Sequence, residues 1–218
     1  MRNGKYTARR TTGTKAFTLM LALILVVGCV AGGTLAWLTA TSEAVTNTFS
    51  VGDINITLKE HNLQTDGTLG TTEVQANDTY KIVPGSTQPK DPFVTVNANS
   101  EKCWLFIRIV ETNNTMTVGE NTEKLVNYAV ADGWTAVPEH AGYYYRVVDA
   151  AATDTTMNVF AGNTAYANGC VTYNENITKG QVTANNKPVI KITAAAIQHD
   201  NIADVATAFD KLPAEFKA

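Results

Sequence analysis

The feature that most constrains this chain is a two-residue alternation of apolar and polar side chains, which recurs in short runs after residue 37. In the first clear run Ile54, Ile56 and Leu58 alternate with polar residues, as expected of a strand with one buried face. Further runs are separated by Gly, Asn or Pro, and they occupy residues 80–83, 92–96, 126–130, 134–137, 143–148, 157–160 and 189–197. Strands this short, about ten residues apart, predict an all-β fold, an antiparallel β-sandwich.

Composition supports strands and turns over exposed helices. Charged residues make up only 17% of the chain, whereas Thr occurs 32 times and Asn 19 times. Residues 103–110 are nearly all apolar, which predicts a central strand with both faces covered. Arg108 interrupts this run, so we expect it to be paired or to lie near the end of the sheet. Residues 61–77 are rich in Gly, Thr, Gln and Asn and are predicted to form a loop.

One short helix is predicted near the C-terminus. Asn201 is the expected N-cap, Asp204 lies in the first turn, and Pro213 ends the helix. The apolar face of this helix, which we expect to pack across the sandwich, consists of Ile202, Val205, Phe209 and Leu212.

The first 36 residues have the composition of an export signal. They contain five basic and no acidic side chains, and residues 16–31 form an uncharged apolar run that small residues follow. An A-x-A-like site predicts cleavage between Ala36 and Trp37. Residues 1–36 are therefore interpreted as a signal peptide, and residues 37–218 as a single secreted domain.

Two alternatives remain open for this segment. The apolar run is marginal in length for a permanent membrane span, so an uncleaved anchor is one alternative. Residues 26–29 also fit a lipobox, in which Cys29 would be lipidated and become the new N-terminus. In the main interpretation the protein contacts the membrane only through the signal segment before cleavage.

The remainder of the chain is acidic. Residues 37–218 hold 12 of the 17 basic residues and all 20 acidic ones, a net charge of about −8. Because binding to phosphate backbones requires clustered Lys and Arg, this excess of acidic residues argues against a nucleic-acid partner.

The sequence contains no recognised catalytic motif. The three histidines, His61, His140 and His199, are far apart in sequence, and no zinc signature, nucleophile motif or nucleotide-binding loop is present. We therefore expect the protein not to be an enzyme, and we predict no metal, cofactor or catalytic residues for it. Cys103 and Cys170 either form a disulfide, as an even pair in a secreted protein suggests, or remain two separate thiols.

Two stretches near the N-terminus read Gly32-Gly33-Thr34-Leu35-Ala36-Trp37-Leu38-Thr39-Ala40 and Asn47-Thr48-Phe49-Ser50-Val51-Gly52-Asp53-Ile54-Asn55-Ile56. They resemble the SipW-dependent signal region of the TasA/camelysin family of secreted Gram-positive surface and biofilm-matrix proteins. Later segments are similar to strand blocks of that family and to its closing strand and helix: residues 80–85, 92–96, 100–108, 194–198 and 203–209.

This resemblance implies a jelly-roll-like sandwich, export, and trimming by a SipW-like signal peptidase. It also implies self-association into extracellular fibres by donor-strand exchange, in which the new N-terminal segment pairs with the sheet of the next subunit. Residues 37–51 suit a donor strand because they lack Pro and carry spaced apolar residues. The candidate donor side chains are Trp37, Leu38, Val45, Phe49 and Val51.

Two other functions remain as alternatives. The first is a monomeric surface adhesin or lipoprotein that binds a ligand. The second is a camelysin-like metallopeptidase, which the scattered histidines support poorly.

Overall fold

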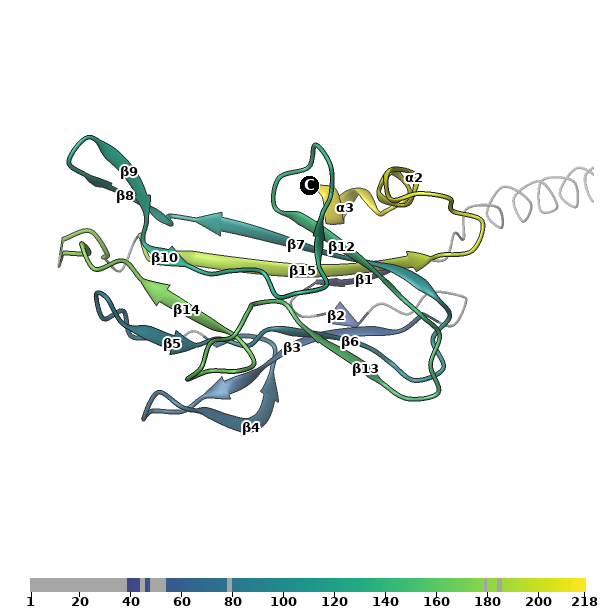
Figure 1. The fold of residues 1–218 in the computed structure, drawn as a ribbon, viewed down its shortest axis with the longest axis horizontal. Helices are drawn as coiled ribbons and strands as arrows, with labels where there is room; N and C mark the ends of the chain where they lie inside the picture. Colours follow the sequence, from purple (N-terminus) through teal and green to yellow (C-terminus); the bar gives the residue numbers. More distant parts are fainter. Residues whose placement is uncertain (1–38, 44–45, 48–53, 78–79, 179, 184–185) are drawn as a thin grey trace, which may run out of the picture. The chain divides into compact units, whose positions relative to one another are not determined.

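Antiparallel strand pairs supply almost all of the regular structure in the computed structural model, which describes residues 39–43, 46–47, 54–77, 80–178, 180–183 and 186–218 (Figure 1). Every pair of strands among these residues is antiparallel. The sheets pack against one another in a sandwich-like arrangement within a compact unit, residues 38–218. The predicted all-β antiparallel sandwich is confirmed.

The longest strands belong to a six-stranded sheet. Its spatial order is β11 (Thr135–Ala136), β12 (Tyr143–Val148), β7 (Cys103–Thr112), β15 (Val189–Gln198), β1 (Thr39–Glu43) and β2 (Thr46–Asn47). Strands β7 and β15 have ten residues each and pair along their whole length. They form the centre of this sheet.

Smaller sheets complete the sandwich. A four-stranded sheet has the order β13 (Thr155–Asn158), β6 (Phe93–Val96), β3 (Ile56–Leu63) and β4 (Leu69–Val74). A three-stranded sheet contains β10 (Val126–Asn127), β14 (Cys170–Tyr173) and β5 (Thr87–Pro89), and a hairpin contains β8 (Thr115–Val118) and β9 (Asn121–Lys124). The main core lies between β3 and β6 on one side and β7 and β15 on the other.

The apolar run of β7 is explained by two separate cores. Leu105 and Ile107 point into the main core between the sheets. Trp104 and Phe106, on the opposite face, belong to a second cluster that also contains residues of the C-terminal helices. Both faces of β7 are therefore covered, as predicted for a central strand. Arg108 is paired, as expected, since its guanidinium donates to the main-chain oxygen of Ala218.

Two short helices, α2 (Val205–Asp210) and α3 (Ala214–Lys217), cover the outer face of β7 and β15 (Figure 1). The prediction of one helix is therefore incomplete, because the chain forms a second helix after Pro213. The predicted cap was also wrong. Asp204 is the N-cap of α2, and its side chain accepts a hydrogen bond from the Thr207 amide. Asn201 instead has φ +63°, a left-handed conformation in the turn before the helix.

Two local predictions are corrected by the structure. Residues 61–77 are not a loop, because they contain the end of β3 and all of β4. The turn between these strands forms where the Asp66 carboxylate accepts from the Thr68 amide and hydroxyl, and where Gly67 has φ +85°. Residues 80–83 were predicted as a strand, but they lie outside the strands of the structure, and Tyr80 and Ile82 line a cavity instead.

Candidate functional site

The edge of the six-stranded sheet is the first candidate site, because the N-terminal segment of the described chain forms it. Strand β1 pairs with β15 through four Cα partners, from Thr39 opposite Ile197 to Ser42 opposite Ala194. It then forms a short hairpin with β2. Residues 39–43 and 46–47 of the candidate donor segment are thus strand residues. The other residues singled out in this region lie outside the described residues: Cys29, Ala36, Trp37, Leu38, Val45, Phe49 and Val51.

Only part of this side of β15 has a strand partner. On its other side all ten residues of β15 pair with β7, but β1 covers residues 194–197 alone. Within the described part of the chain, residues 189–193 have no strand on the β1 side. A strand edge of this kind offers unpaired main-chain donors and acceptors to another chain.

Three of the four β15 residues that β1 covers have small side chains. Ala194, Ala195 and Ala196 are fully buried, and they alternate between the two cores on either side of the sheet. Alanine adds little apolar area, so these three residues add little to the attraction beyond the main-chain ladder. Each such hydrogen bond contributes only about 0.5–1.5 kcal/mol net.

A second candidate site is a buried polar cluster on β3 and on the segment between β5 and β6. Glu60 is 4% exposed and accepts hydrogen bonds from the Lys90 ammonium at 2.8 Å and from the Asn77 amide at 2.6 Å. Tyr80 lies near the same carboxylate, with a 3.5 Å hydroxyl contact. Burial, followed by the negative charge of Glu60, raises the pKa of Tyr80, so its hydroxyl stays protonated.

Beside this cluster His61 and Asp91 form a hydrogen-bonded pair. The Nδ1 atom of His61 lies 2.7 Å from one carboxylate oxygen of Asp91, and the His61 amide donates to the other oxygen. Asp91 is 1% exposed, and burial raises the pKa of its carboxyl group. This pair orients an imidazole, but within the described residues no nucleophilic side chain is hydrogen-bonded to that ring.

The other two histidines lie elsewhere. His140 stacks on Phe209 at 4.2 Å between ring centroids, and His199 stacks on Trp104 at 5.0 Å. Within the described residues, no group of three or more His, Cys, Asp or Glu side chains is arranged to hold a metal ion. The structure thus does not bring the three histidines together.

The two cysteines in this part of the chain are free thiols. Cys103 lies on β7 in the main core, whereas Cys170 lies on β14 in the three-stranded sheet. Of the two alternatives that the sequence left open, the structure contains the separate thiols. Burial raises the pKa of Cys103 to about 12, which makes it a poor nucleophile near neutral pH.

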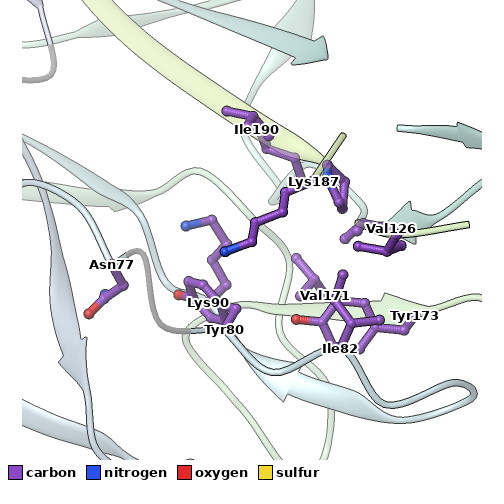
Figure 2. Close-up of a pocket in the computed structure, with 12 residues that line it drawn as sticks. Asn77, Tyr80, Ile82, Lys90, Val126, Val171, Tyr173, Lys187 and Ile190 are labelled. Carbon is purple, nitrogen blue, oxygen red and sulfur yellow. The ribbon is translucent and has the colours of Figure 1, made fainter. Parts of the chain in front are cut away.

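A cavity of about 530 Å³ lies between the smaller sheets and the start of β15 (Figure 2). Its wall is mostly apolar, and Lys90 and Lys187 also line it. A smaller cavity of about 240 Å³ adjoins it between β3 and β15, and shares Asn77, Lys90, Val189 and Ile190 with it.

Sequence reasoning missed the polar cluster, although one signal for it was present. The alternation of Ile56 and Leu58 continues to position 60, so Glu60 falls on the same face of β3 as these apolar residues. A carboxylate on a buried face requires a partner. Nothing local in the sequence identifies that partner as Lys90, because the two residues meet only when β3 packs beside the segment that precedes β6.

No family model, no curated protein and no solved structure matches this chain. In the described part of the chain, no helix has both the length and the apolar character needed to cross a bilayer.

Proposed function

We propose that this protein is a secreted structural protein of the cell surface or extracellular matrix, and that it is a fibre subunit. In this proposal a SipW-like signal peptidase removes residues 1–36, as the resemblance to the TasA/camelysin family implies. The freed N-terminal segment then adds to the sheet of another subunit by donor-strand exchange. The observation that carries the proposal is the position of β1, which pairs with β15 through four residues and forms one edge of the six-stranded sheet together with β2.

The energetics of this edge support exchange between subunits. The ladder of main-chain hydrogen bonds between β1 and β15 joins four pairs of residues, and three of the four β15 residues are alanines. Exchange replaces each of these bonds with the same bond between two molecules, so it requires little net change in contact energy. The partner-free residues 189–193 of β15, within the described chain, give an incoming strand additional main-chain groups to pair with.

Cleavage supplies a switch in this proposal. Before cleavage, residues 37–51 are joined to the apolar segment 16–31, which restricts the segment to the membrane where the chain is exported. After cleavage the segment is a free end, and a free end can reach a neighbouring subunit. Assembly therefore follows export, so fibres form outside the cell.

Deleting residues 37–51 is expected to abolish the polymer and leave the fold intact. The proteins to compare are residues 37–218 and residues 52–218, by sedimentation and electron microscopy, with circular dichroism to verify the fold. We expect filaments in the longer protein alone, because the shorter one retains the acceptor edge but has no donor strand.

A synthetic peptide of residues 37–51 provides the matched control. Added to residues 52–218, it should form a soluble one-to-one complex, because it fills the acceptor edge without providing a new one. Filaments that persist without residues 37–51 would contradict donor-strand assembly. Monomers in both proteins would instead favour the surface adhesin or lipoprotein alternative.

A further inference from the structure

The cavity in Figure 2 has an apolar interior and a charged side. Buried or half-buried side chains form its apolar wall: Ile82, Val126, Val171, Val182, Pro188 and Ile190. In Figure 2 the side chains of Lys90 and Lys187 both extend to one side, away from Val126 and Val171. Its volume of about 530 Å³ lies within the usual range for small-molecule sites.

The polar groups of the cavity are mostly engaged already. The Tyr173 hydroxyl donates to Gln88 at 3.2 Å, and the Tyr80 hydroxyl lies 3.5 Å from Glu60. Burial raises the pKa of Tyr173 to about 12, so this hydroxyl remains neutral. A neutral polar ligand such as a sugar would thus find few free hydrogen-bonding partners here.

The charges leave one ammonium available. Lys90 is paired with the buried carboxylate of Glu60 at 2.8 Å. The Lys187 side chain forms no ion pair or hydrogen bond with any described residue. Because the charges of Lys90 and Glu60 cancel, the Lys187 ammonium is left as a single uncompensated positive charge, which suits a monoanion. The Glu60 carboxylate disfavours a dianion such as a phosphate monoester.

We propose that this cavity binds a fatty carboxylate, with the acyl chain against the apolar wall and the carboxylate at the Lys187 ammonium. Binding would remove the apolar surfaces of both the acyl chain and the cavity wall from water. The charge-assisted contact at Lys187 would fix the orientation of the ligand. This binding site goes beyond the proposed structural function and does not depend on assembly into fibres.

Isothermal titration calorimetry with dodecanoate, below its micellar concentration, tests the proposal. The protein is residues 37–218, which contain every described strand and helix. Dodecanol, which has the same chain without the charge, is the matched ligand. We expect one dodecanoate per subunit and roughly tenfold weaker binding of dodecanol.

Three variants separate the parts of the site. Lys187→Met should weaken dodecanoate binding about tenfold and leave dodecanol binding unchanged. Lys81→Met removes an exposed lysine that does not line the cavity, and should change neither affinity. Val182→Trp fills the cavity from a half-buried position, so it should abolish binding of both ligands.

Any of three results would overturn the proposal: equal affinity for dodecanoate and dodecanol, an unchanged affinity in Lys187→Met, or full binding in Val182→Trp. Thermal unfolding of each variant verifies that it is folded. The outcome of the deletion experiment on fibres does not affect this test of ligand binding, since no residue of β1 or β2 lines the cavity.

Discussion

Replacing Lys90 with methionine is expected to lower the free energy of unfolding by about 3–5 kcal/mol. The substitution removes the ammonium that lies 2.8 Å from Glu60 and leaves that carboxylate buried without its ion-pair partner. Both side chains are well shielded from water, with exposed fractions of 14% for Lys90 and 6% for Glu60. Urea unfolding at pH 7 measures the loss.

Lys59→Met is the matched control for this prediction. Lys59 pairs with Glu73 at 2.7 Å, but its side chain is 38% exposed and that of its partner is 46% exposed. An exposed pair of this kind contributes about 0–1 kcal/mol. A second test is Lys90→Met combined with Glu60→Gln, which should recover part of the loss because no buried charge remains. Equal losses in Lys90→Met and Lys59→Met would show that Glu60 does not depend on its ion pair.

Replacing Phe106 with alanine is expected to cost about 3–5 kcal/mol of stability. Phe106 is fully buried on β7, and its ring lies 6.2 Å from that of Tyr145 and 5.9 Å from that of Phe209 on α2. The truncation therefore leaves a cavity between the sheet and the helix that covers it. Equilibrium unfolding in urea provides the measurement.

Val147→Ala on neighbouring β12 is the control for Phe106→Ala. Val147 is 39% exposed, so the loss of its two methyl groups should cost less than about 1 kcal/mol. If Phe106→Ala cost no more than this control, the second cluster would not be a packed core. The C-terminal helices would then contribute little to the stability of the sandwich.

The fold class could be predicted because the strands with the strongest patterns are also those with the most extensive pairing. Residues 143–148 form β12 with the predicted bounds, and the run 103–110 lies within β7. Residues 189–197 differ from β15 by one residue. In each of these segments the apolar residues are those that face a core, so the sequence pattern directly indicates which residues form the strand.

Other features depend on contacts between distant residues, and the sequence pattern does not reveal them. The segment 80–83 has a strand-like composition, but Tyr80 and Ile82 face a cavity, and none of the described strands pairs with them. Residues 61–77 have a loop-like composition, yet the turn at Asp66 and Gly67 returns the chain to β3 as a hairpin. In both cases the tertiary contacts of the segment, rather than its local propensity, decide whether it forms a strand.

Of the two candidate sites, only the one that involves the N-terminal segment was anticipated from the sequence. The N-terminal segment was predicted to pair with the sheet of the next subunit, whereas the described part of it forms β1 and pairs with β15 of its own chain. Whether that edge exchanges between subunits remains a prediction. The cluster of Glu60, Lys90 and Asp91 could not be predicted from local sequence, since it assembles from β3 and a segment about 30 residues later.

Disulfide trapping between β1 and β15 tests the central claim most directly. Ala40 and Ala196 are Cα partners in the β1–β15 ladder. Two proteins of residues 37–218, one with Ala40→Cys and the other with Ala196→Cys, are mixed during assembly and oxidised. Both also contain Cys170→Ser, which removes the more accessible of the two native thiols. A mixture of Ala40→Cys with Val147→Cys, which lies on β12, controls for random collision.

Donor-strand exchange predicts a covalent dimer between the Ala40→Cys and Ala196→Cys proteins, and little dimer in the control mixture. It also predicts that the double variant, Ala40→Cys with Ala196→Cys, oxidises to a ladder of covalent multimers. The contradictory result is a double variant that closes its disulfide only within one chain, together with no covalent dimer in the mixture. In that case β1 would be a permanent strand of its own subunit, and the fibre proposal would be wrong.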